Sequence, residues 1–202
     1  MRGMELPPPA PGEENYRALA LANTRMTVAG EQVDRLRDPA TGTAWLVEQG
    51  LAPADGRLGE PCAIRLRDFR DHARNLLTAF AADSEPEPAD LAALNDALTS
   101  TPAVSLLVWD KAGGPRRVEP LSADRLVDTA IARLAADTAD LLTSADASVL
   151  AACGAPGCIR FYLRTHASRQ WCSTRCGDRV RAARHYARRT GAAEPVQAGS
   201  QA

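Results

Sequence analysis

Residues 153–176 read CGAPGCIRFYLRTHASRQWCSTRC and contain four of the five cysteines of a chain of 202 residues. Their spacing is Cys153-x4-Cys158-x13-Cys172-x3-Cys176, which places two close pairs on either side of a longer loop. A short loop can hold two sulfur atoms on one side of a metal ion, and zinc takes four such ligands in a tetrahedron. We therefore predict that these four thiolates bind one structural Zn²⁺. A site with four protein ligands is closed, which favours a structural role over a catalytic one.

The same cysteines are also compatible with two disulfides or with four unrelated thiols. No stretch approaches the roughly 20 apolar residues of a membrane span, and the first residues lack the apolar core of a signal peptide. We therefore expect a cytoplasmic protein with no membrane partner. In that compartment thiols stay reduced, and clustered cysteines are more often metal ligands than disulfides. We expect His166, in the intervening loop, and Cys62, far away in the sequence, to stay outside the ligand set.

The net charge of −1 is the sum of two oppositely charged parts of the chain. Residues 153–190 contain nine arginines against one acid, Asp178, whereas residues 1–152 contain 15 basic and 23 acidic residues. The first of these segments has a charge of +8 and the second a charge of −8. An acidic body with a basic end indicates that the basic end meets a polyanion.

A helix is predicted after the last cysteine, with an apolar stripe on one face and arginines on both flanks of the stripe. Cys176, Val180, Ala183 and Ala187 form the stripe. Arginines in this arrangement suit contact with nucleic-acid phosphates, and DNA is the partner that we expect. A solvated helix in an arginine-rich protein is the alternative. The arginines predicted to contact nucleic acid are Arg175, Arg179, Arg181, Arg184, Arg188 and Arg189.

The predicted fold class is α+β. The N-terminal domain is expected to be mostly helical and to have a small antiparallel hairpin. The C-terminal part is expected to be a small treble-clef-like or knuckle-type zinc module that ends in a helix. The expected divisions are a disordered N-terminus (1–12), the N-terminal domain (13–148), the zinc module (149–190) and a disordered tail (191–202). Apolar periodicity and capping residues predict helices over 14–28, from Pro39 onward, over 61–82, over 89–98, and over 122–143 with Ser122 as N-cap. Strands are predicted over 31–37, 103–109 and 116–121, the last two as a hairpin.

The acidic N-terminal domain carries few groups that could do chemistry. Its one histidine is His72, and no serine–histidine–aspartate set or glycine-rich phosphate loop stands out. We therefore expect that the protein is not an enzyme. Polar residues on otherwise apolar helices could line a pocket for a small-molecule effector, or could be surface and capping residues. The candidates for such a pocket are Asn23, Arg25, His72 and Arg74.

The motif WCSTRCGDR at residues 171–179, preceded by the first cysteine pair and Phe161, resembles the CGNR zinc finger. This finger closes a family of bacterial proteins whose N-terminal part is called the ABATE domain. The N-terminal part of the chain is similar too, at LALANT (19–24), at WL and GL (45–51) and at LNDAL (94–98). The resemblance covers residues from about 14 to 190.

The resemblance implies a stress-induced transcription regulator with a DNA-binding finger, whose zinc ligands are the four cysteines. Two positions depart from the family pattern. Asp178 replaces the signature asparagine, and Leu163 stands where family members often have an aspartate.

The predicted function is that of a zinc-containing, DNA-binding transcription regulator whose N-terminal domain senses a ligand or a partner. The alternative is a ligand-sensing or interaction protein with a purely structural zinc, in which the basic finger docks on the acidic body. An enzyme with a structural zinc ranks last. An oligomer is compatible with each of these hypotheses.

Overall fold

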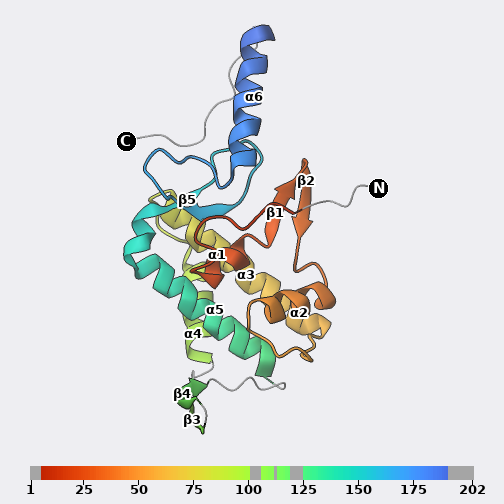
Figure 1. Ribbon diagram of the computed structural model, residues 1–202, viewed down its shortest axis with the longest axis vertical. Coiled ribbons are helices and arrows are strands. Elements are labelled where there is room, and N and C mark those ends of the chain that lie inside the picture. The colour runs from red at the N-terminus through yellow and green to blue at the C-terminus, as the bar shows by residue number, and fades with distance from the viewer. Residues whose placement is uncertain (1–5, 101–105, 112, 119–124, 191–202) are drawn as a thin grey trace.

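The computed structural model describes residues 6–100, 106–111, 113–118 and 125–190. A helical body is followed by a small module with a projecting helix (Figure 1). This arrangement confirms the predicted α+β class. The helices of the body are α1 (Arg17–Ala22), α2 (Pro39–Glu48), α3 (Glu60–Ala81), α4 (Pro88–Ser100) and α5 (Leu126–Thr143). Its antiparallel hairpins are β1 (Arg25–Val28) with β2 (Glu31–Asp34), and β3 (Leu106–Asp110) with β4 (Gly114–Val118). The 3-10 helix Ala145–Val149 leads into the module, which consists of β5 (Leu150–Ala152), β6 (Phe161–Leu163) and α6 (Thr174–Thr190).

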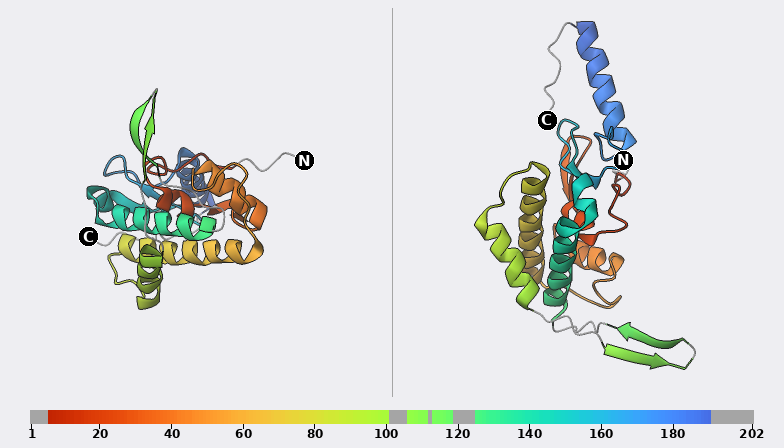
Figure 2. Two further views of the ribbon diagram at one scale, coloured as in Figure 1. Left: turned by 90° about the horizontal axis from the view of Figure 1, so that it is seen from below. Right: turned by 90° about the vertical axis from the view of Figure 1, so that its left-hand side faces the viewer.

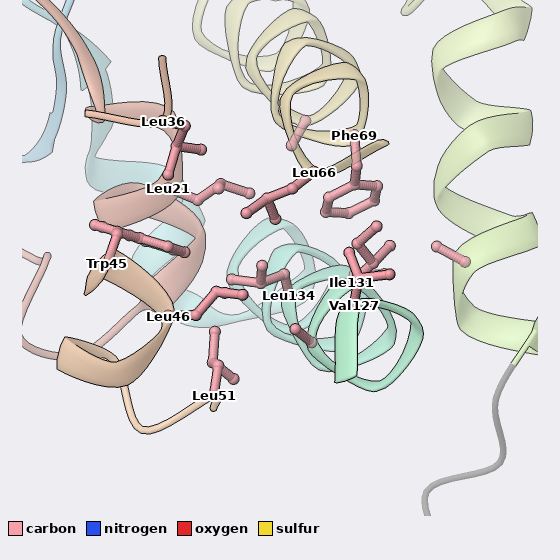
Figure 3. Close-up of a cluster of buried hydrophobic side chains, with 14 of the residues drawn as sticks. Leu21, Leu36, Trp45, Leu46, Leu51, Leu66, Phe69, Val127, Ile131 and Leu134 are labelled. Atoms are coloured by element: carbon pink, nitrogen blue, oxygen red, sulfur yellow. The ribbon is translucent and has the colours of Figure 1, made fainter. Parts of the chain in front are cut away.

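The core of the body lies where α3 packs against α5, with α2 and α4 on their flanks (Figure 2). Apolar residues at steps of three and four place Leu66 and Phe69 of α3 on one face, and Ile131 and Leu134 of α5 on the face opposite. Figure 3 shows these side chains pointing toward one another, with Leu46 of α2 closing one side. Burying a side chain of this size contributes about 1.5–3 kcal/mol. The α3–α5 contact therefore provides a rigid frame for the rest of the chain.

Two short helices begin by different means. Asp38 caps α2, because its carboxylate accepts from the Thr41 N–H at 2.8 Å while the Thr41 hydroxyl accepts from the Asp38 N–H at 3.2 Å. The Thr41 N–H also holds the pKa of the Asp38 carboxyl below its usual value. Helix α1 lacks a side-chain cap of its own, and the Ala18 N–H donates to Asp137 of α5 at 2.6 Å. The first turn of α1 is therefore held by a tertiary contact.

The helix predicted over residues 14–28 is wrong beyond Ala22. The chain turns after α1 and continues as β1, whose last two residues are β-branched and favour a strand. The partner strand β2 ends at Asp34, so it is shorter than the predicted strand over 31–37. The hairpin turns at Ala29 and Gly30, whose φ angles are 53° and 91°. Positive φ at both positions matches the twist of a tight hairpin.

Disorder is also the wrong prediction for residues 6–12. Ala10 is fully buried, and the Leu163 N–H donates to the Pro11 carbonyl at 2.8 Å. Burial of the chain against β6 therefore orders a segment whose proline-rich composition is typical of a flexible arm. The predicted disorder of residues 1–5 and 191–202 falls outside the described residues.

The long elements follow the sequence pattern closely. The helices predicted over 61–82 and 89–98 are confirmed as α3 and α4, and the hairpin predicted between residues 103 and 121 is confirmed as β3–β4. Helix α5 begins at Leu126, and the predicted N-cap Ser122 lies outside the described residues.

Among the described helices, none is both long and apolar enough to cross a membrane.

Buried polar side chains join the C-terminal module to the body. Asn23, which is 2% exposed, donates to the Phe161 carbonyl at 2.8 Å and accepts from the Phe161 N–H at 2.8 Å. Arg74 of α3 donates to the carbonyls of Ala22 and Ile159 and lies over the Phe161 ring, 5.2 Å from its centroid. Burial lowers the pKa of Arg74 to about 10, so the guanidinium stays charged at neutral pH. The end of α1, the middle of α3 and the start of β6 are therefore fixed to one another.

A second buried cation strengthens this junction. Arg160, which is 3% exposed, donates to Glu13 at 2.8 Å and to the Pro8 carbonyl at 2.9 Å. The same Glu13 oxygen accepts from Asn23 at 2.7 Å. Removing one partner of a buried pair of this kind leaves an uncompensated charge, which is costly. The N-terminal segment, the body and the zinc module therefore share one polar network.

The Asn23→Ala variant tests this junction. It leaves the N–H and the carbonyl of Phe161 without partners in a buried position, where each unsatisfied group costs about 1–3 kcal/mol. We expect a loss of about 2–5 kcal/mol in the free energy of unfolding, measured by urea denaturation of the zinc-loaded protein. The control is Asn95→Ala, at an exposed position on α4, which should change stability little. If the two variants were equally stable, the role of Asn23 in stabilising the junction would be contradicted.

Candidate metal centre

The four cysteines come from two loops that meet beside β6. Cys153 and Cys158 lie in the loop between β5 and β6, Cys172 precedes α6, and Cys176 lies in the first turn of α6. All four sulfur atoms lie within 4.8 Å of one another. Two of the separations, Cys158 to Cys172 and Cys172 to Cys176, are 3.8 Å. A tetrahedron with zinc–sulfur bonds of about 2.3 Å has edges of about 3.8 Å. The cluster therefore fits one structural zinc ion, and it is the zinc-binding site of the chain.

Backbone hydrogen bonds give the loops this shape. In the first loop the Cys158 N–H donates to the Ala155 carbonyl at 2.9 Å, and Gly157 has a φ of 72°, which favours glycine. The Gly154 N–H donates to the Gln170 carbonyl at 3.2 Å, which ties the first loop to the second. These bonds bring the two cysteine pairs together, although 13 residues separate them in the sequence.

Donors around the sulfur atoms offset part of the negative charge of the cluster. The Cys172 N–H points to the sulfur of Cys153 at 3.4 Å, and the Arg179 guanidinium lies 3.8 Å from the sulfur of Cys176. Four thiolates exceed the charge of Zn²⁺ by two units, so such donors stabilise the charged form.

The four thiols cannot ionise alike when they are this close together. The hydrogen bond with Cys153 lowers the pKa of Cys158 to about 7, and Cys153 is also the largest cause of the lowered pKa of Cys176. The pKa of Cys172 is raised, first by Cys153 and then by its other neighbours. The pKa of Cys153 is raised as well, first by its hydrogen bond with Cys158. A divalent cation at the centre removes this conflict, because it is bound by the deprotonated form of every ligand.

A small apolar core surrounds the cluster. Cys176 and Val180 of α6 pack there with Tyr162 of β6, and Trp171 lies against the same group. Ala183, by contrast, is exposed, so the predicted apolar stripe is wrong at that residue. The stripe is right at Cys176, Val180 and Ala187, all of which are buried. Helix α6 projects away from the body (Figure 1).

Glycine at position 177 fits the crowding beside this core. A Cβ atom there would lie 3.1 Å from the Trp171 ring and 3.1 Å from the Arg181 guanidinium. The guanidinium of Arg181 lies over the same ring, 6.0 Å from its centroid. The carboxylate of Asp178 accepts from Arg181 at 2.6 Å on the surface.

The six arginines predicted to contact nucleic acid are all on α6. Arg184 is half-buried, and the other five are exposed. They follow the helix as it stands away from the body, which both figures of the whole chain show (Figures 1 and 2). Within the described part of residues 153–190, Asp178 is the one acidic residue. The zinc cluster therefore presents a long, strongly basic helix to the solvent.

Two family models match the chain. One is the ABATE model, described as "Putative stress-induced transcription regulator", and it matches residues 16–145. The chain belongs to the ABATE family. The second model is the CGNR zinc finger, which matches residues 150–189 and contains all four zinc ligands. No curated protein matches the chain. The two models describe a regulator and a zinc finger, in agreement with the resemblance read from the sequence.

The four residues proposed for an effector pocket in the ABATE domain lie in different surroundings in the structure. Asn23 and Arg74 come together, but they do so in the junction with the zinc finger, where both make buried hydrogen bonds. Arg25 is half-exposed, 4.0 Å from Asp71. His72 lies elsewhere, and its Nδ1 is 2.7 Å from the buried carboxylate of Asp90 on α4. Their polar groups are therefore engaged with the protein itself.

Sequence reasoning missed the role of Arg160 and Glu13 in joining the two parts of the chain. Arg160 is one of nine arginines in the basic segment, and its residue type gives no sign that it is buried. The one available signal was its place between a zinc ligand and the aromatic pair Phe161 and Tyr162, both of which are buried. Residues next to buried aromatics in a small module have little room to reach solvent.

The Cys172→Ser variant tests the metal centre. It removes the ligand that lies 3.8 Å from two others, and structural zinc contributes on the order of 10 kcal/mol to the folding of such modules. We expect loss of bound zinc, measured by elemental analysis, and separate melting of the C-terminal module. The control is Cys62→Ser, which removes the one cysteine outside the cluster and should keep one zinc per chain. A full complement of zinc in Cys172→Ser would contradict the assignment.

Proposed function

We propose that the protein is a cytoplasmic transcription regulator that binds DNA through the arginines of α6. The observation that carries this proposal is the exposure of five arginines on a helix that projects from the zinc cluster. Phosphate contacts from arginine supply most of the affinity of a protein for DNA, and they depend strongly on salt. The proposed phosphate-contacting residues are Arg175, Arg179, Arg181, Arg184, Arg188 and Arg189.

The dimensions of α6 support this proposal. The helix has 17 residues and is therefore about 25 Å long, enough to follow a groove over several base pairs. The zinc ligand Cys176 and its neighbour Val180 anchor the first turns in the small core. The arginines further along lie on a helix that is already formed, so binding orders their side chains and not the backbone.

The alternative function is a ligand-sensing or interaction protein with a purely structural zinc, in which the basic finger docks on the acidic body. The opposite charges of the two parts favour it. The finger does pack on the body at the junction, but Asn23, Arg74 and Arg160 make these contacts and none of them lies on α6, so docking leaves the basic charge of α6 unexplained. We therefore rank DNA binding first and assign the ABATE domain the sensing of a ligand or partner.

Replacing Arg181, Arg184 and Arg188 together by glutamine tests DNA binding. We expect weaker binding to all duplex sequences alike, because phosphate contacts carry no base information. The slope of log affinity against log salt should fall by about one for each arginine–phosphate pair that the substitutions remove. The measurement is fluorescence anisotropy with labelled duplexes over a salt series.

The matched control for this triple variant is the replacement of Arg65, Arg116 and Arg117 by glutamine. These arginines are exposed on the body, so the same charge is removed far from α6. The control should keep the salt slope of the unmodified protein. If both variants lost the same affinity for DNA, the loss would be explained by the change in net charge. That result would contradict an interface on α6.

The Asp178→Asn variant should strengthen DNA binding. Asp178 pairs with Arg181 at 2.6 Å in a position where both side chains are more than half exposed. Loss of the carboxylate releases Arg181 for phosphate and removes a repulsive charge. Exposed pairs are worth little, so we expect a gain of about two- to fivefold at low salt, measured by the same anisotropy assay. Asp96→Asn, with the same charge change on α4, should have no such effect, and weaker binding by Asp178→Asn would contradict this role of the pair.

A further inference from the structure

The β3–β4 hairpin is set apart from the rest of the fold. It lies at one end of the protein, and α6 lies at the other (Figures 1 and 2). In the described part of the chain, each of its two strands has only the other as a neighbouring strand, and none of its residues belongs to the three buried apolar clusters. An isolated two-stranded hairpin is marginally stable at best in water. A further surface that packs against this hairpin would therefore stabilise it.

Strand β3 exposes four large apolar side chains in succession. Their exposed fractions are 49%, 70%, 37% and 73%, for Leu106, Leu107, Val108 and Trp109 in that order. Exposed apolar side chains on the described helices, such as Phe80 and Leu91, occur singly. Single residues of this kind are normal on a protein surface, whereas a contiguous apolar patch marks a site of interaction. The apolar run therefore indicates a docking surface on β3.

The two strands of the hairpin differ in how well they can accept a further strand. Strand β4 contains Pro115, which has no backbone N–H, followed by Arg116 and Arg117. Prolines and charged side chains on an edge strand oppose pairing with another chain. Strand β3 has neither a proline nor a charge over residues 106–109, and its valine and tryptophan favour strand structure. The outer edge of β3 is therefore the one suited to pair with another strand.

The charges of the chain favour a second copy of the protein as the partner. Residues 106–118 contain three basic residues and one acid, which gives a net charge of +2. The remainder of residues 1–152 contains 12 basic and 22 acidic residues, which gives a net charge of −10. The basic hairpin of one copy is therefore attracted to the acidic body of another. An anionic lipid surface would also attract the hairpin, but it would repel the acidic body.

We propose that β3 of one copy pairs with β3 of a second copy, antiparallel and about a two-fold axis, so that two hairpins form one four-stranded sheet. A pairing centred on Val108, the middle residue of β3, brings all five residues of both strands into register. It places Leu107 opposite Trp109 of the second copy on one face of the sheet, and the two Val108 side chains opposite each other on the other face. Every contact is made twice, because a two-fold interface joins the same surface to itself.

The antiparallel arrangement also brings opposite charges together. The turn of each hairpin, which carries Lys111, lies beside the base of the other hairpin. Along the chain that base follows α4 and precedes α5, and these helices carry Asp96 and Asp128 near the ends concerned. The pairing therefore suits both the apolar and the basic character of the hairpin.

A dimer of this kind leaves both basic helices available. The hairpin and α6 lie at opposite ends of the protein, so the two α6 helices of the dimer stand far apart (Figure 1). A short DNA duplex would then meet one α6 at a time. The proposed dimer does not rest on the proposed function, and each can fail without the other.

The test is sedimentation velocity of the zinc-loaded full chain over the micromolar concentration range. We expect a reversible monomer–dimer equilibrium, because the interface is smaller than the standard size of about 1,600 Å². Leu107→Lys combined with Trp109→Lys should raise the dissociation constant at least about thirtyfold, since a tryptophan anchor is lost and charges enter the edge. Zinc content and thermal melting of this variant should stay unchanged, because the hairpin lies outside the buried clusters. The matched control is Phe80→Lys combined with Leu91→Lys, the same charge change at exposed apolar positions on α3 and α4, which should keep the dimer.

A second measurement tests the edge of β3 itself. In a Cys62→Ser background, Val108→Cys should form a disulfide-linked dimer under mild oxidation that leaves the zinc bound. The reason is that the two Cβ atoms on the axis lie about 5 Å apart. The matched control is Arg116→Cys, which pairs with Val108 within the hairpin but lies on β4. The two β4 strands of the sheet are about 14 Å apart, too far for a disulfide.

A chain that stays monomeric over this range would overturn the proposal. If that monomer bound vesicles of phosphatidylglycerol and phosphatidylcholine, and Trp109→Lys abolished the binding, a lipid surface would replace the second copy as the partner. A dimer that survives the double lysine variant would overturn the proposal too, as would cross-linking of Arg116→Cys as fast as that of Val108→Cys. Anisotropy with a short duplex is measured in parallel. Absence of DNA binding by an intact, Trp109-dependent dimer would refute the proposed function and leave this interface in place.

Discussion

The bonds between one zinc ion and four thiolates are the constraint on which the basic helix depends. They close two loops that contain few apolar residues and fix Cys176 in the first turn of α6. The core around them is small, with Tyr162 and Val180 among its few sizeable side chains. A core of that size does not stabilise a module by itself. The metal therefore provides much of the folding free energy, and the direction in which α6 leaves the module follows from it.

The second constraint is the polar junction that joins the module to the body. Asn23, Arg74 and Arg160 each satisfy backbone or carboxylate groups across it, and each is largely buried. Such contacts contribute orientation more than net stability, because the cost of desolvation cancels much of their attraction. They turn a finger on a short linker into a fixed extension of the helical body.

The elements that were predicted correctly are those determined by residues close together in the sequence. Helix α3 has apolar residues at steps of three and four over its 22 residues, and Asp38-Pro39 marks the start of α2. The cysteine spacing, together with the expected reducing compartment, predicted the zinc site. The predictions from sequence were wrong where contacts between residues far apart in the chain determine the structure. Residues 6–12 are ordered by β6, and α1 ends early because Asn23 is recruited into the junction. The burial of Arg160 depends on how two separate segments meet, and no periodicity encodes that.

Hydrogen–deuterium exchange before and after zinc removal tests the central claim most directly. The claim is that the metal orders the junction and α6, whereas the α3–α5 core is stabilised by its own apolar packing and stays folded without zinc. The account predicts that removal of zinc by a chelator makes the amides of Phe161 and of α6 exchange rapidly. The amides in the middle of α3 and α5 should stay protected. Unchanged protection of the Phe161 amide and of the first turns of α6 in the metal-free protein would contradict the account.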